Sequence, residues 1–257
     1  MIRRILPALV ILAALSLPAA AQPPRVVVSL PPLHSLVAKL LKGVAEPELL
    51  MPQRTAGRLA DLSAAQVQAL RAADLVVWSG PALEGAIAEA RLVMPDLNAR
   101  TLTLSTQLPV LTASQTGAPD RPGTAQDLRF WLDPRLAHVA VHVLAPALAR
   151  VYPDSVDAIL DNEIAVMHEL HHLEDAVRSA LGTTVGVPLH MGASDLRYLE
   201  WRFNLAQEGC ARRGFDPSGF GLPAGPDLYD RLMTRARETL AACQRRDLAS
   251  LTKAATP

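Results

Sequence analysis

The sequence predicts an α/β protein with two parallel-sheet lobes joined by a long backbone helix, the second lobe being reduced. Two observations lead to this prediction. Short β-branched runs alternate with helical patterns in the first half of the chain, which is typical of a parallel sheet covered on both faces. A single uninterrupted helical pattern then occupies residues 153–181 and leaves only a short remainder behind it.

The first lobe is expected over residues 22–152. Buried strands are indicated where apolar or β-branched runs stop at turn residues, and helices where apolar residues recur at three- and four-residue steps. On these criteria strands are predicted at residues 25–30, 47–51 and 74–80, and helices at residues 33–41 and 62–73.

The stretch "DLRFWLDP" (127–134) places one arginine, Arg129, inside an apolar run. It follows residues 112–126, whose Thr, Gly and Pro content predicts a surface loop. Asp133 and Pro134 then supply the N-cap and first-turn proline of a helix that continues to about Arg150. Arg129 is therefore expected near a strand-to-helix junction, where open α/β sheets line their ligand crevice.

The helical pattern of residues 153–181 spans on the order of 40 Å at 1.5 Å per residue, so we expect both lobes to share it. Residues 182–257 form the second lobe, with a strand at 184–189 and helices at 195–203 and 227–246. Each βαβ unit takes roughly 30 residues, so the length that remains allows only a small lobe.

Residues 1–21 have the pattern of a secretory signal peptide, with two arginines, an apolar run and small residues up to Ala21. The apolar run is shorter than the roughly 20 residues of a membrane span, and no second one follows, so no span is expected after cleavage. Removing Arg3 and Arg4 lowers the 25 basic residues to 23 against 25 acidic ones. This balance argues against nucleic acid or an anionic membrane as a partner.

Two cysteines in an exported chain, Cys210 and Cys243, predict one disulfide that closes a loop of roughly 33 residues. No Cys-x-x-Cys pair indicates redox chemistry. Ser79 and Ser194 lie near predicted loops, but neither has the Gly-x-Ser-x-Gly setting of a nucleophile. With no phosphate-cradling glycine loop either, the sequence predicts no catalytic residues and no enzyme.

Five segments, in this order, resemble the periplasmic zinc-binding proteins of bacterial zinc and manganese ABC transporters. They are "VVVSLPPLHSLVAKLLKGV", "ADLVVWSGPALE", "LRFWLDPRLA", "LRYLEWRFNL" and "FDPSGFGLPAGPDLYDRLM". The resemblance implies two α/β lobes that hold one Zn²⁺ between them with three histidines and a carboxylate or water. Imidazole and carboxylate groups are suitable zinc ligands. It also implies a periplasmic protein that delivers its ion to a membrane permease. We expect the protein to be a monomer.

The resemblance locates the family's ligand positions in this chain. The first histidine position is occupied by Arg58, the second by Arg129 and, in an ungapped alignment on Tyr198, the third by Ala193. The fourth position keeps a carboxylate, Asp216. Arginine has no lone pair for a metal and stays protonated, so the usual site cannot form from these residues.

Three outcomes are open for the cleft. A weakened zinc site survives with His190 and Asp216 if three residues are inserted before Tyr198. Alternatively Arg58 or Arg129 pairs with Asp216 and holds the lobes together without metal, at the cost of desolvating the charges. In the third outcome Arg58 and Arg129 together bind an anion, since guanidinium groups suit carboxylate or phosphate.

The other histidines have less specific settings. His168, His171 and His172 lie on one predicted helix face, which is either a solvated stripe or an accessory metal face. His34 begins the first helix and is a candidate for lining the cleft. The expected function is that of the substrate-binding component of a zinc ABC transporter with an impaired or altered metal site. The alternative is a metal-free interaction or regulatory protein on the same scaffold.

Overall fold

The structure is a computed structural model, and it describes residues 23–53, 58–111, 126–181, 197–203, 215–239 and 241. The predicted leader, the strand at 184–189 and most of the loop at 112–126 lie outside these residues. The division at residues 22, 153 and 182 into leader, lobes and linking helix remains a prediction.

Four parallel strands form the sheet, in the order β2-β1-β3-β4. Their bounds are Val26–Val28 for β1, Glu48–Leu49 for β2, Leu75–Trp78 for β3 and Thr101–Thr103 for β4. The first three were predicted, and the parallel α/β class is confirmed. All four carboxyl ends meet at one edge, and the chain reverses its direction of winding between β1 and β3. That reversal marks the edge where such sheets bind ligands.

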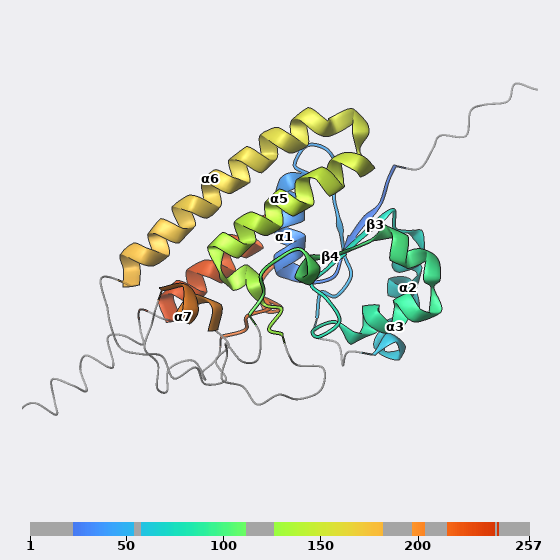
Figure 1. Ribbon diagram of the computed structural model, residues 1–257, viewed down its shortest axis with the longest axis horizontal. Coiled ribbons are helices and arrows are strands. Elements are labelled where there is room, and N and C mark those ends of the chain that lie inside the picture. The colour runs from blue at the N-terminus through green and yellow to red at the C-terminus, as the bar shows by residue number, and fades with distance from the viewer. Residues whose placement is uncertain are drawn as a thin grey trace, which may run out of the picture.

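Helices cover both faces of the sheet. Figure 1 shows α1, α5 and α6 on one side and α2 and α3 on the other. The helices are α1 (Pro31–Leu40), α2 (Ala64–Ala72), α3 (Gly85–Val93), α5 (Pro134–Val151), α6 (Val156–Leu181) and α7 (Arg197–Phe203), with a further helical segment at 228–239. Single 3₁₀ turns include η1 (Leu59–Asp61), η4 (Phe130–Leu132) and η5 (Pro153–Ser155).

The predicted helix start at Asp133 is confirmed. Its carboxylate accepts a hydrogen bond from the backbone N–H of Arg135 at 2.9 Å, and Pro134 is the first helical residue. The strand-to-helix junction expected near Arg129 is instead a 3₁₀ turn, which Phe130, Trp131 and Leu132 form. Their side chains are fully buried, so three consecutive apolar residues must point inward, which an alternating strand does not allow.

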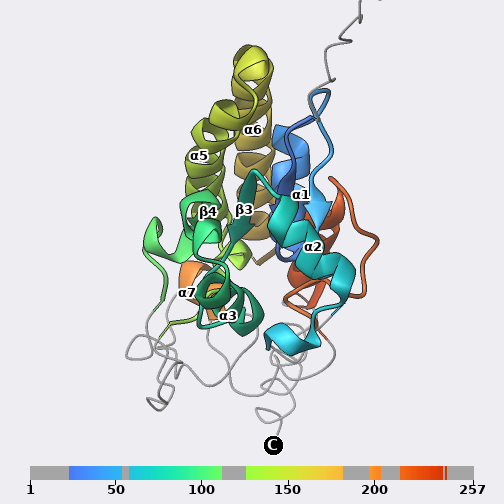
Figure 2. The same cartoon turned by 90° about the vertical axis from the view of Figure 1, so that its right-hand side faces the viewer.

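Helix α6 lies antiparallel to α5 and also packs on α1, as Figures 1 and 2 both show. The helix itself was predicted, but not all of the apolar residues that recur along it are buried. Leu160 and Ile164 are exposed, whereas Glu163 and Glu174 are buried in the same stripe as Ile159 and Val166. Each buried carboxylate has a partner on α5: Glu163 meets His142 at 2.9 Å, and Glu174 meets Arg135 at 2.9 Å. Pairing therefore offsets the desolvation of these two charges.

The turn that follows β3 is organised by one buried carboxyl group, that of Glu84. Its Oε2 accepts hydrogen bonds from the backbone N–H groups of Ser79 at 2.7 Å and Gly80 at 3.0 Å. Gly80 has φ +149°, and a Cβ there would lie 2.4 Å from the Ser105 hydroxyl. Burial raises the pKa of Glu84 to about 7, against the opposing effect of the Ser29 hydroxyl and the two N–H groups.

We expect this carboxyl group to make stability fall as pH rises. The folded-state pKa lies above the ordinary value of 4.5, so the folded state holds a proton that the unfolded state releases between pH 4.5 and 7. Over that range the free energy of unfolding of the wild type should drop on the order of 3 kcal/mol further than that of Glu84→Gln. Urea denaturation at several pH values measures this difference. Asp96→Asn, which removes an exposed carboxylate, should follow the wild type; identical pH profiles for wild type and Glu84→Gln would contradict the assignment.

Candidate functional site

The segment around Arg129 is anchored by its apolar neighbours. Trp131 and Phe130 are fully buried and meet edge to face, with ring centroids 5.6 Å apart. The Trp131 indole donates a hydrogen bond to the carbonyl of Pro217 at 2.7 Å, and the Tyr229 hydroxyl donates to the Trp131 carbonyl at 2.7 Å. These contacts set the backbone from which Arg129 extends, and they bring residues 216–217 close to it.

The Arg129 guanidinium faces Asp127. Its Nε donates to Oδ1 at 2.9 Å and its NH2 group donates to Oδ2 at 2.8 Å, while the backbone N–H of Arg129 also donates to Oδ1 at 3.0 Å. This is the bidentate fork that arginine and carboxylate groups prefer. The side chain of Arg129 is 20% exposed and that of Asp127 is 5% exposed, so the pair is largely removed from water.

Asp127 has a second arginine partner on α7. The NH1 group of Arg197 donates to Oδ2 at 2.9 Å. Burial alone would raise the pKa of Asp127, but the hydrogen bonds and charge of Arg129, with the charge of Arg197, lower it below its ordinary value. Asp127 is therefore ionised near neutral pH. Both Arg129 and Arg197 therefore pair with one ionised carboxylate.

Two further contacts hold α7 to the same region. The Arg202 guanidinium binds the buried carboxylate of Asp133, with Nε 2.8 Å from Oδ1 and 2.9 Å from Oδ2. The Tyr198 hydroxyl accepts a hydrogen bond from the backbone N–H of Leu111 at 3.0 Å and donates to the carbonyl of Asp127. Tyr198 thus joins the two sides of the predicted loop at 112–126. The short helix α7 is fixed by three polar side chains.

Arg58 does not share this carboxylate. It precedes η1, its side chain is 76% exposed, and its Nε lies 4.0 Å from Oε1 of Glu89. An exposed pair at this distance contributes little. The two arginines that were expected to face one cleft are therefore bound to separate carboxylates.

The carboxylate of Asp216 is engaged by its own turn. Its Oδ1 accepts from the backbone N–H of Ser218 at 3.0 Å and its Oδ2 from that of Phe220 at 2.8 Å. Among the ion pairs between described residues, neither Arg58 nor Arg129 pairs with Asp216. Among the described residues of this region, the arginine side chains pair instead with Asp127 and Asp133. Four other predicted positions lie outside the described residues: His190, Ala193, Cys210 and Cys243.

The histidines of α6 are exposed. His171 lies 3.6 Å from the carboxylate of Asp175, and the rings of His171 and His172 have centroids 6.2 Å apart. His168 is on the same face of the helix. Among the described residues, no three His, Cys, Asp or Glu side chains come together as a metal ion would need.

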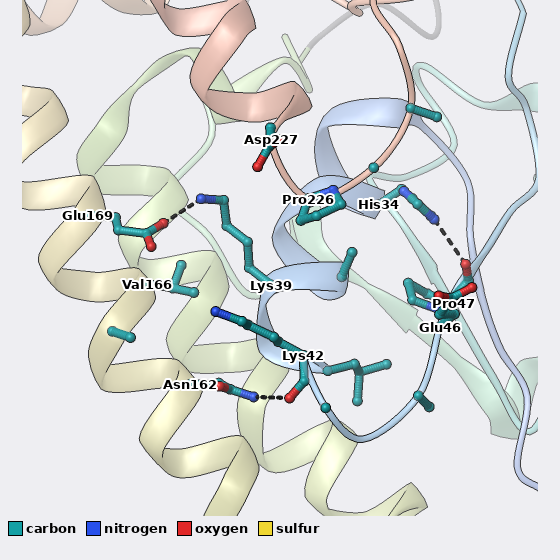
Figure 3. A pocket seen from close by; sticks show the side chains of 17 residues that line it. His34, Lys39, Lys42, Glu46, Pro47, Asn162, Val166, Glu169, Pro226 and Asp227 are labelled. Atoms are coloured by element: carbon teal, nitrogen blue, oxygen red, sulfur yellow. Dashed lines mark hydrogen bonds and ion pairs between the residues drawn. The ribbon is translucent and has the colours of Figure 1, made fainter.

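His34 lines a pocket of about 650 Å³ between α1, α6 and residues 224–227, and neither Arg129 nor Asp216 belongs to that lining. Figure 3 shows His34 and Pro47 on one wall and Glu169 on the opposite wall. The His34 ring is 9% exposed, and its Nε2 lies 2.9 Å from the Pro47 carbonyl, which makes it the donor. Burial lowers the pKa of His34, although the bond to Pro47 opposes this.

The polar groups of this pocket mainly join the elements around it. The Lys39 ammonium donates to Glu169 of α6 and, at 2.8 Å, to Asp230. Asn162 of α6 donates to the carbonyl of Leu40 at 3.0 Å and to that of Lys42 at 2.9 Å, and Figure 3 shows the second of these bonds. These side chains are already hydrogen-bonded, so we assign the pocket a structural role.

The polar partners of Arg129 were not identified from the sequence. Asp127 stands only two residues before Arg129, but a fork between such close neighbours requires the tight backbone path that the 3₁₀ turn provides. Arg197 and Arg202 were seen only as part of a helix. Their spacing of five residues gives no signal, because their carboxylate partners lie about 70 residues earlier in the chain.

The comparisons agree with this architecture. The fold is shared with solved structures of solute-binding proteins, among them FpvC and a ZnuA. The sequence model of "Zinc-uptake complex component A periplasmic" (ZnuA) matches residues 26–248, and the chain belongs to this family.

Two relatives are named "High-affinity zinc uptake system protein ZnuA". That of Paracoccus denitrificans is 25% identical over an alignment of 326 positions, which covers 91% of this chain and 97% of the relative. That of Brucella abortus is 21% identical and covers 85% of this chain and 91% of the relative.

Solved structures show the same fold. A mutant of FpvC from Pseudomonas aeruginosa aligns with a TM-score of 0.67 at 16% identity and covers 86% of this chain and 99% of that one. Zn(II)-bound AdcA from Streptococcus pneumoniae aligns with a TM-score of 0.57 at 20% identity; the match covers 73% of this chain but only 40% of that one. Within the part of the chain that the structure describes, no helix has the length and apolar character needed to cross a bilayer.

The buried Tyr198 hydroxyl allows a direct test of the α7 contact. Tyr198→Phe should lower the free energy of unfolding by about 1–3 kcal/mol, because it leaves the Leu111 N–H and the Asp127 carbonyl without a partner. Equilibrium urea denaturation measures the loss. Tyr152→Phe is the matched control, since its partner is the carbonyl of exposed Pro24, which water can reach. Equal losses of unfolding free energy for the two variants would mean that burial of the Tyr198 hydroxyl adds nothing to the contribution of its hydrogen bonds.

Proposed function

We propose that this chain is the periplasmic substrate-binding component of a zinc ABC transporter, with a metal site that differs from the usual family site. In this role it captures its ion in the periplasm and delivers it to a membrane permease. The match of the family model to residues 26–248 carries the proposal. Two relatives named as zinc uptake proteins, each aligned over most of its length, support it. The family is a transporter component, and the chain is not proposed to be an enzyme.

The difference in the site rests on the residues at the expected ligand positions. Arg58, Arg129 and Ala193 stand where the family resemblance expects imidazoles. Arg129 supplies no lone pair, and its guanidinium is directed at Asp127. The remaining candidate donors are His190 and Asp216, which are few for tight capture of Zn²⁺. Zinc is the cargo in this proposal, bound more weakly than a full ligand set would allow.

A smaller second lobe accompanies the altered site. The alignment to the Paracoccus relative has 326 positions, more than the 257 residues of this chain, so that relative contains segments that this chain lacks. We place the reduction in residues 182–257 and the disulfide between Cys210 and Cys243. The leader at residues 1–21 is proposed to direct export, after which the protein acts as a monomer.

The contacts give less support to binding of an anion by Arg58 and Arg129. That hypothesis needs two guanidinium groups directed at one ligand, whereas Arg129 is directed at Asp127 and the exposed Arg58 lies beside Glu89. The other alternative is a metal-free interaction protein. It differs from the zinc carrier in predicting no saturable heat when Zn²⁺ is titrated into the protein.

Calorimetric titration of the mature protein with Zn²⁺ tests the proposal. We expect one saturable site with a Kd above about 1 μM, because few donors remain. His190→Ala should abolish it, whereas a His168→Ala/His171→Ala/His172→Ala variant, which removes the exposed α6 histidines, should leave it unchanged. No saturable heat would instead support the metal-free protein. Submicromolar binding would show that the site is not impaired.

A further inference from the structure

We infer that the positively charged side chain of Arg129, held in place by Asp127, fixes α7 against residues 127–133. We call Arg129 in this role a tethered cation, and the contact between α7 and residues 127–133 the joint. The joint forms without a bound metal ion. The inference rests on the proposed function, because that proposal places Arg129 at a ligand position of the metal cleft. It goes beyond it by assigning the residue a task of its own, which is to hold two distant parts of the chain together.

The acceptor capacity of Asp127 is the first argument. An ionised carboxylate offers about four lone-pair sites. Oδ1 accepts from the backbone N–H and the Nε of Arg129, at 3.0 and 2.9 Å. Oδ2 accepts from the NH2 group of Arg129 at 2.8 Å and from Arg197 at 2.9 Å. Four donors therefore fill this carboxylate, and it has no lone pair left with which to ligate a metal ion.

The sharing of one carboxylate is the second argument. Asp127 pairs with both Arg129 and Arg197. Arg197 of α7 therefore reaches a carboxylate whose position and ionisation Arg129 stabilises. Arg129 thus acts on α7 through Asp127 and is a positioning residue.

The rigidity of both sides is the third argument. On one side, the buried indole of Trp131 and its bond to Pro217 hold the segment that carries Arg129. On the other, α7 also contacts this segment through Arg202, which binds Asp133, and through Tyr198, which donates to the carbonyl of Asp127. A guanidinium fork between fixed partners has one favoured geometry, so the joint does not depend on whether the cleft holds an ion.

Hydrogen exchange followed by mass spectrometry tests this inference. In the wild type, amide exchange in peptides covering 127–133 and 197–203 should be the same in EDTA and in saturating Zn²⁺. Arg129→Met should raise exchange in both peptides by about tenfold or more in EDTA, because it removes a partly buried ion pair. Arg129→Lys, which keeps the charge but loses the fork, should give a smaller increase.

The matched control is Arg25→Met, which removes an exposed pair with Glu48 that is 3.1 Å long and remote in sequence from α7. It should leave both peptides unchanged, and in every variant the peptide covering β3 should stay protected if the fold is intact. Faster exchange in 197–203 when EDTA is added to the wild type would overturn the inference, and so would unchanged exchange in Arg129→Met. If Arg129→Met does not fold, the wild-type comparison decides alone.

This outcome is independent of the calorimetric one. The proposed function fails if the wild type binds no zinc, whatever its exchange pattern. The inference about Arg129 fails if EDTA speeds amide exchange in residues 197–203 of the wild type, or if Arg129→Met leaves that exchange unchanged, whatever the zinc affinity.

Discussion

The carboxylate of Asp127 is the constraint on which the joint between α7 and the sheet lobe depends. It is nearly inaccessible to water, and so it is stable as an ion only while enough donors surround it. Arg129 supplies three of them and Arg197 the fourth. Each arginine is in turn desolvated only because the carboxylate is there. Loss of one partner therefore leaves the others buried without compensation, which is the arrangement in which single substitutions cost most.

Much of the sheet lobe could be predicted from the sequence, because its signals are local. The run Val26–Val28, the turn residues around β3 and the Asp133 cap each act within a few residues. Helix α3 and strand β4 were not predicted: α3 begins with a glycine and small residues, and β4 has only three residues, of which two are threonines. The exposed Leu160 and Ile164 show a second limit. Which face of α6 is buried depends on where α5 offers partners to Glu163 and Glu174.

For the candidate site, the sequence singled out Arg129 but not its environment. Family resemblance indicated the position, and the chemistry of guanidinium excluded it as a ligand. Its partners could not be deduced, because Asp127 contacts it only through the turn formed by Phe130, Trp131 and Leu132, and Arg197 arrives from far along the chain. The guanidinium proposed to stand at a ligand position is thus part of a set of polar contacts that also includes Asp127 and Arg197.

The two edge strands of the sheet, β2 and β4, are short, and this limits association between copies of the protein at high concentration. β2 contains two residues and β4 three, so an incoming chain would gain few backbone hydrogen bonds by adding to either side. On β2 the carboxylate of Glu48, held by Arg25, also places charge where a neighbouring strand would have to lie. The protein is in this way protected from joining its own copies into extended sheets.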